Sequence, residues 1–105
     1  MERKKNRHSI PIATSIEHVY PEKPQTMTLA NPSLISNIGN LVLLEDDINS
    51  KIGNKEYADK RTYVLEKSKM ITAKELFNTY SIWSDTEILQ RKNILINEMY
   101  KTMWT

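Results

Sequence analysis

The residues best suited to chemistry are one histidine, one acid and two asparagines. Glu17 and His18 are adjacent at the end of an apolar stretch that begins near Ala13. Asn40 opens a second apolar stretch, and Asn49 follows that stretch. Hydrolysis of a phosphodiester needs a base that activates water and a hard cation that neutralises charge on the phosphate oxygens. His18 could supply the base, and Glu17 with Asn49 could hold the cation.

The predicted cation site consists of two hard oxygen donors. A carboxylate from Glu17 and an amide oxygen from Asn49 suit Mg²⁺, or Mn²⁺, which keeps several waters and binds substrate phosphates as further ligands. Adjacent residues of a strand point to opposite faces, so Glu17 and His18 can meet one phosphate only where the strand twists or ends. Pro21 favours an ending at this point.

Each of these residues also has an ordinary structural interpretation. A lone histidine at a strand end is more often structural than catalytic, and an asparagine near a helix start is often only its N-cap. We interpret Asn40 as a bracket whose amide ties the loop after His18 to the second strand. A general base needs a fixed ring with a free distal nitrogen, and a strand that runs into an irregular loop offers carbonyls to fix it.

The composition indicates one globular domain. The chain has 105 residues, of which 27% are charged and 39% hydrophobic, so it can bury a modest core. It contains no cysteine, which excludes disulfides and thiolate zinc sites. Only two glycines are present, too few for a glycine-rich phosphate loop of the usual kind. No apolar run approaches the roughly 18 residues of a membrane span and no signal peptide is evident, so we expect a cytoplasmic location.

Positive charge is concentrated in two places, although the net charge is only +2. We expect residues 1–12 to form a basic arm and residues 13–105 to form the domain. The cations of the arm are Arg3, Lys4, Lys5 and Arg7. Within the domain, we expect a second group to contact a DNA backbone without reading bases: Lys51, Lys55, Lys60 and Arg61. The alternative is an ordinary solvated helix face beside a disordered arm.

The pattern of apolar and breaking residues predicts a small hairpin covered by helices, an α+β fold. A strand should run from near Ala13 to His18, and a second strand from Asn40 to Leu44, as a loose antiparallel pair. The connection contains three prolines and exceeds the usual loop length, which is typical of a functional segment.

Helices should occupy most of the second half of the chain. One should begin at Asp46 or Asp47 and stop at Gly53, and another should follow up to Lys67 with Tyr57 and Val64 facing inward. Capping boxes at Thr72 to Glu75 and at Ser84 to Glu87 predict helices that start at about residues 73 and 85. The last of these carries a wide apolar face.

Together these segments resemble the C-terminal HNH domain of GmrSD-type restriction endonucleases, from about residue 15 to the end. The resemblance rests first on Glu-His-Val-Tyr-Pro at 17–21, Ile-Gly-Asn-Leu-Val-Leu-Leu at 38–44, and then Asn49, Asn54, Lys55 and Lys60. Its later part rests on Ser68, Trp83, Ile88, Arg91 and Trp104.

The resemblance implies a ββα-metal (HNH) finger packed against C-terminal helices, double-stranded DNA that could be modified as substrate, and a divalent cation. His18 falls on the general base and Glu17 on a metal ligand. Asn40 falls on the asparagine of the catalytic set that opens the second strand, and Asn49 closes the metal site. Such proteins also carry an NTP-using domain that resembles ParB, which we expect as another domain or as a partner chain.

The sequence therefore predicts a metal-dependent DNA endonuclease or nickase of a restriction system that defends against phage. One alternative is a DNA-binding or regulatory module that keeps the HNH scaffold and does not cut. Another is a purely structural interaction domain, favoured by the apolar last helix.

Overall fold

The fold of residues 13–104 is described from a computed structural model, with side chains from residue 13 to residue 103. The predicted basic arm at 1–12, with Arg3, Lys4, Lys5 and Arg7, lies outside the described residues. The described part of the chain has no helix that is long and apolar enough to cross a membrane.

Two short strands form an antiparallel hairpin, as the sequence predicts. β1 (Thr14–His18) pairs with β2 (Leu41–Glu45), and His18 lies opposite Leu41 in the register. A long loop joins the strands and contains two 3₁₀ helices, η1 (Pro32–Ser36) and η2 (Ile38–Asn40). The second strand thus begins one residue later than predicted, because Asn40 still belongs to η2.

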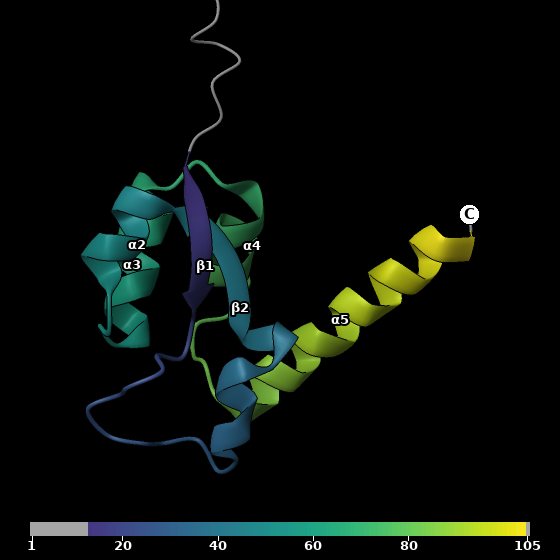
Figure 1. Ribbon diagram of the computed structural model, residues 1–105, viewed down its shortest axis with the longest axis horizontal. Helices are drawn as coiled ribbons and strands as arrows, with labels where there is room; N and C mark the ends of the chain where they lie inside the picture. The colour runs from purple at the N-terminus through teal and green to yellow at the C-terminus, as the bar shows by residue number, and fades with distance from the viewer. Residues whose placement is uncertain (1–12, 105) are drawn as a thin grey trace, which may run out of the picture.

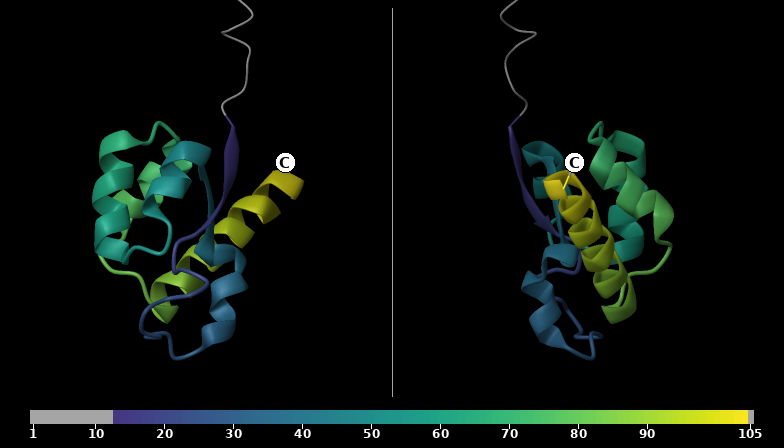
Figure 2. Two further views of the ribbon diagram at one scale, coloured as in Figure 1. Left: turned by 60° about the vertical axis from the view of Figure 1, so that its left-hand side comes forward. Right: turned by 90° about the vertical axis from the view of Figure 1, so that its right-hand side faces the viewer.

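Four α-helices follow the hairpin and complete an α+β fold. They are α2 (Asp46–Ile52), α3 (Tyr57–Lys67), α4 (Ile71–Thr79) and α5 (Asp85–Trp104). The views in Figures 1 and 2 show α2, α3 and α4 gathered on one face of the hairpin, while the C-terminal half of α5 runs away from the other elements. The opposite face of the hairpin is open, since Ile16 is 59% exposed and Leu43 is 50% exposed.

The core lies between the covered face of the hairpin and the helices. Its fully buried apolar side chains are Val19, Leu44, Ile52, Val64, Ala73, Phe77 and Ile88. Tyr57 stacks on both Phe77 and Trp83, which joins α3 to α4 and to the segment before α5. The inward orientation predicted for Tyr57 and Val64 is confirmed.

The predicted helix starts have different outcomes. Before α5, the backbone N–H of Ser84 donates to the Glu87 carboxylate (2.8 Å), and the Ser84 hydroxyl makes a second, short hydrogen bond to it. This is half of the expected capping box. The capping box predicted at Thr72 to Glu75 is wrong, because α4 already begins at Ile71 and Thr72 lies inside its first turn.

Helix α5 holds the end of the long loop in place. A side chain at Gly39 would not fit, since a Cβ there would stand 2.1 Å from the Ile88 carbonyl oxygen of α5. The buried guanidinium of Arg91 donates to the carbonyls of Gly39 (3.1 Å) and Leu41 (2.7 Å). The entry to β2, and with it Asn40, is therefore fixed against the first half of α5.

Candidate active site

His18 ends β1 and stays accessible. Its side chain is 26% exposed, and its Nδ1 lies 3.8 Å from the carboxylate of Glu22, beyond hydrogen-bonding distance. Among the described residues, no hydrogen bond holds either imidazole nitrogen. Within the part of the chain that the structure describes, no carbonyl accepts a hydrogen bond from the ring as expected, and the Glu22 carboxylate lies only within ion-pair distance of Nδ1. The histidine thus has the accessibility that a general base needs, with a loosely held ring.

Glu17 points to the opposite face of β1 and is buried against α3. Its Oε2 accepts a hydrogen bond of 2.6 Å from Nζ of Lys60, and both side chains are almost fully buried. Burial raises the pKa of Glu17 and lowers the pKa of Lys60, while their mutual attraction opposes both shifts. Removing one partner of such a buried pair typically costs about 3–5 kcal/mol, because the other charge is left uncompensated.

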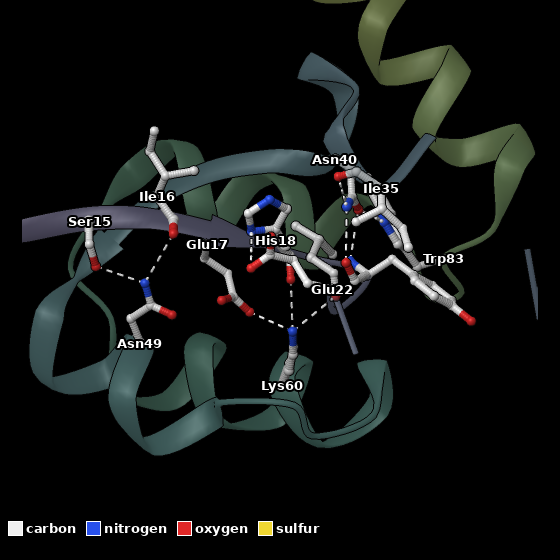
Figure 3. Close-up of polar contacts among 12 residues, drawn as sticks. Ser15, Ile16, Glu17, His18, Glu22, Ile35, Asn40, Asn49, Lys60 and Trp83 are labelled. Carbon is white, nitrogen blue, oxygen red and sulfur yellow. Dashed lines mark hydrogen bonds and ion pairs between the residues drawn. The ribbon is translucent and has the colours of Figure 1, made fainter. Parts of the chain in front are cut away.

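Asn49 lies inside α2 and faces β1, so it is not the N-cap that the structural interpretation suggested. Its Nδ2 donates to Ser15 Oγ (2.7 Å) and to the Ile16 carbonyl (3.3 Å). Ser15 and Glu17 are two residues apart in a strand and therefore share a face. Figure 3 shows the Glu17 carboxylate and the Asn49 amide on this common side of β1.

These two side chains supply the oxygen donors that the sequence predicts for a hydrated divalent cation, one carboxylate that is paired with Lys60 and one neutral amide. Because the nitrogen of the Asn49 amide is held by β1, its oxygen faces away from those partners, and no described residue donates to it. Glu17 would contribute Oε1, since Oε2 is taken by Lys60. The described residues contain no group of three or more His, Cys, Asp or Glu that could hold a metal. A cation would thus depend on water and on substrate oxygens for most of its ligands.

Asn40 is fully buried and joins three segments of the chain. Its Oδ1 accepts hydrogen bonds from the Tyr20 backbone N–H (2.7 Å) and from Nε1 of Trp83 (2.8 Å). Its Nδ2 donates to the carbonyls of Tyr20 (3.0 Å) and Ile35 (2.8 Å). These contacts tie the chain just after His18 to the entry of β2, the position that the sequence suggested for this amide.

The four predicted DNA-contacting cations are placed differently from one another. Lys51, at the end of α2, and Lys55 are exposed. Arg61 is half-buried and donates through Nε to the carbonyl of Phe77 (2.7 Å). Lys60 is fully buried, and this placement contradicts its predicted contact with a DNA backbone. Its ammonium instead belongs to the interior of the candidate site.

Sequence reasoning missed the pairing of Lys60 with Glu17. The spacing of Tyr57, Lys60 and Val64 on α3 is that of one helix face, and it carried a usable signal. Because Tyr57 and Val64 were expected to face inward, the lysine between them had to face inward as well. A buried lysine requires a buried acceptor, and Glu17 is the acid that supplies it.

Comparison with known proteins adds one finding to this geometry. The family model described as the C-terminal domain of GmrSD restriction endonucleases matches residues 2–98 of the chain. Neither the comparison with curated proteins nor the comparison with solved structures gave a match. The matched span includes β1, β2, the long loop, all of α2 to α4 and most of α5. The chain belongs to the family of GmrSD restriction endonuclease C-terminal domains.

Proposed function

We propose that this domain is a metal-dependent DNA endonuclease or nickase built on an HNH finger. The observation that carries the proposal is that α2 brings Asn49 to the face of β1 that holds Glu17, the residue that precedes the accessible His18 in the chain. The order of strand, long loop, strand and helix supports this reading. The buried hydrogen bonds between the Asn40 amide and the Tyr20 backbone, just after His18, support it as well. Membership of a restriction endonuclease family favours DNA as the substrate.

In the proposed reaction, His18 takes a proton from a water molecule that attacks phosphorus in line with the leaving oxygen. Glu17 and Asn49 would hold a Mg²⁺ or Mn²⁺ ion, which when bound supplies positive charge to the non-bridging and leaving oxygens. Asn40 positions the chain around His18 and does not touch the reacting atoms. The expected products are 5′-phosphate and 3′-hydroxyl ends.

Lys51, Lys55 and Arg61 would place the DNA by contacts with its backbone. Lys51 and Lys55 follow Asn49 along the chain and are exposed, so they are available to phosphates near the proposed cation site. By analogy with GmrSD-type enzymes, we also propose that an NTP-using ParB-like domain or partner chain acts together with this domain.

One observation favours a second candidate function, a DNA-binding or regulatory module that does not cut. Lys60 already occupies one oxygen of Glu17 and neutralises its charge. A site with a compensated carboxylate and one amide attracts a cation less strongly than a site with several free acids. Cleavage and binding must therefore be measured separately.

A plasmid nicking assay distinguishes the two functions. Supercoiled plasmid is incubated with the full chain and Mg²⁺ or Mn²⁺, with and without excess chelator, while DNA binding is followed by a mobility shift. Nicking that the chelator abolishes and added metal restores would support the endonuclease. Salt-sensitive DNA binding without nicking under any metal condition would instead support the non-cutting module.

A further inference from the structure

Lys60 is the one described lysine that is fully buried, and its partners lie at the end of β1 and directly after it. Its Nζ donates to Oε2 of Glu17 (2.6 Å) and to the carbonyls of His18 (2.9 Å) and Val19 (3.1 Å). Three acceptors match the three N–H groups of an ammonium. Figure 3 shows this side chain reaching from α3 to the end of β1.

The position of Lys60 fixes the charge of the donor set. The anionic charge of Glu17 is matched by the adjacent ammonium, and the amide of Asn49 is neutral. A divalent cation at Oε1 of Glu17 would also lie close to a positive charge that is held in place, because Nζ also donates to the carbonyls of His18, the last residue of β1, and of Val19, which follows it. Burial weakens the screening of this repulsion by solvent.

We propose that Lys60 is a positioning residue that makes cation binding at this site depend on DNA. A DNA phosphate would supply the negative charge and the oxygen ligands that the protein alone does not provide. The cation would then bind tightly only in the complex, and the enzyme would not hold it in the absence of substrate. This inference rests on the proposed function, since it assigns the cation to Glu17 and Asn49.

The test is the affinity for Mn²⁺, measured by electron paramagnetic resonance with and without a short DNA duplex. The His18→Ala background prevents cleavage during the titration and leaves both proposed ligands intact. We expect the duplex to tighten Mn²⁺ binding at least tenfold, within the usual range of coupling between two ligands. Equal affinity with and without the duplex, or no Mn²⁺ binding in either condition, would overturn the inference.

Lys60→Gln tests the role of the lysine itself. Loss of its charge should tighten Mn²⁺ binding in the absence of DNA and reduce the gain from the duplex to about threefold or less. Lys67→Gln is the matched control, since Lys67 is exposed on the same helix and its replacement changes the net charge equally. The same duplex effect in both variants would contradict the proposal.

Asn49→Asp tests the charge argument without breaking the buried pair, in case Lys60→Gln does not fold. An aspartate there adds the negative charge that the site lacks, so it should allow Mn²⁺ binding without DNA. If the duplex tightens Mn²⁺ binding as much in the Asn49→Asp variant as in the protein that retains Asn49, the inference fails. The nicking assay judges the proposed function independently: nicking together with DNA-independent Mn²⁺ binding refutes only this inference, and DNA-dependent Mn²⁺ binding without nicking refutes only the endonuclease.

Discussion

Asn40 shows how one side chain can connect segments that are far apart in the sequence. Its four hydrogen bonds reach the chain after His18, the long loop and the segment before α5. Asn40→Ala should therefore lower the free energy of unfolding by about 2–4 kcal/mol, because buried donors and acceptors lose their partners. Urea denaturation followed by tryptophan fluorescence measures this change. Asn97→Ala on the exposed part of α5 is the control and should stay within about 0.5 kcal/mol of the wild type.

Glu45 should give the stability a component that depends on pH. Burial alone would raise its pKa, but hydrogen bonds from the Lys69 N–H (2.8 Å) and the Ser68 hydroxyl (2.8 Å) lower the pKa overall. A lowered folded-state pKa stabilises the protein above the unfolded-state pKa, and this stabilisation is lost as the pH falls through the folded-state value.

Glu45→Gln should accordingly lower the free energy of unfolding at neutral pH by about 1–3 kcal/mol. The difference in the free energy of unfolding between this variant and the wild type should shrink as the pH falls below about 4, where carboxylates become protonated. Urea denaturation of both proteins at neutral pH and below about pH 4 measures this difference. Glu66→Gln, at an exposed position, should leave the pH dependence unchanged. A difference that stays constant with pH would show that the charge of Glu45 does not contribute.

The sequence was informative where a residue's role depends on its local neighbours. The position of Asn40 just before an apolar stretch was enough to predict that its amide connects the loop after His18 to the second strand, since turns and strand entries are local features. The partners of Lys60 depend on how α3 packs against β1, which pairs residues more than 40 positions apart. Local spacing on α3 indicates that Lys60 faces inward, but it does not identify Glu17 as the partner.

At the scale of elements, the close approach of η2 to α5 determines where β2 begins. A Cβ at Gly39 would stand 2.1 Å from the Ile88 carbonyl oxygen and 3.0 Å from the Lys92 backbone nitrogen. Gly39→Ala should force the two elements apart and cost about 1–3 kcal/mol of stability, as overpacked substitutions do. Chemical denaturation measures the cost, with Ser36→Ala at an exposed position as control. Unchanged stability would mean that η2 can shift freely against α5.

Element boundaries were predictable where capping or breaking residues are distinctive. Gly53 ends α2, and its positive φ of 42° is a conformation that favours glycine. Helix α5 begins at Asp85, immediately after Ser84, and the Glu87 carboxylate accepts a hydrogen bond from the Ser84 N–H, as expected. The start of α4 was misjudged because Met70 precedes it without any side-chain cap, so packing of Ala73, Leu76 and Phe77 decides the helix start.

At the scale of the whole molecule, the exposed cations should make DNA binding sensitive to salt. The affinity should fall linearly on a log–log plot against salt concentration, with a slope set by the number of phosphates neutralised. Replacing both Lys51 and Lys55 by Gln should reduce the magnitude of this slope by about 2. The control replaces Lys74 and Lys101, exposed on α4 and α5, and changes the net charge equally. Equal salt slopes in the two double variants would mean that Lys51 and Lys55 do not contact the DNA backbone.

The general architecture followed from composition and pattern, while the outward path of α5 did not. A single amphipathic helix gives no indication of how far it extends beyond the body that it packs on. Its first half contacts η2, and its C-terminal end projects past the other elements (Figure 1). Several of its large apolar side chains are therefore exposed: Ile94, Ile96, Met99, Tyr100 and Met103.

The most direct test of the account is plasmid nicking by His18→Ala, measured beside the wild type with Mg²⁺ or Mn²⁺ at equal DNA occupancy. If His18 is the general base, the rate should fall by at least about 10²-fold, within the range typical for loss of such a base, while DNA binding stays within about twofold. His8→Ala, which removes the other histidine, should nick at the wild-type rate. Undiminished nicking by His18→Ala would contradict the proposed active site.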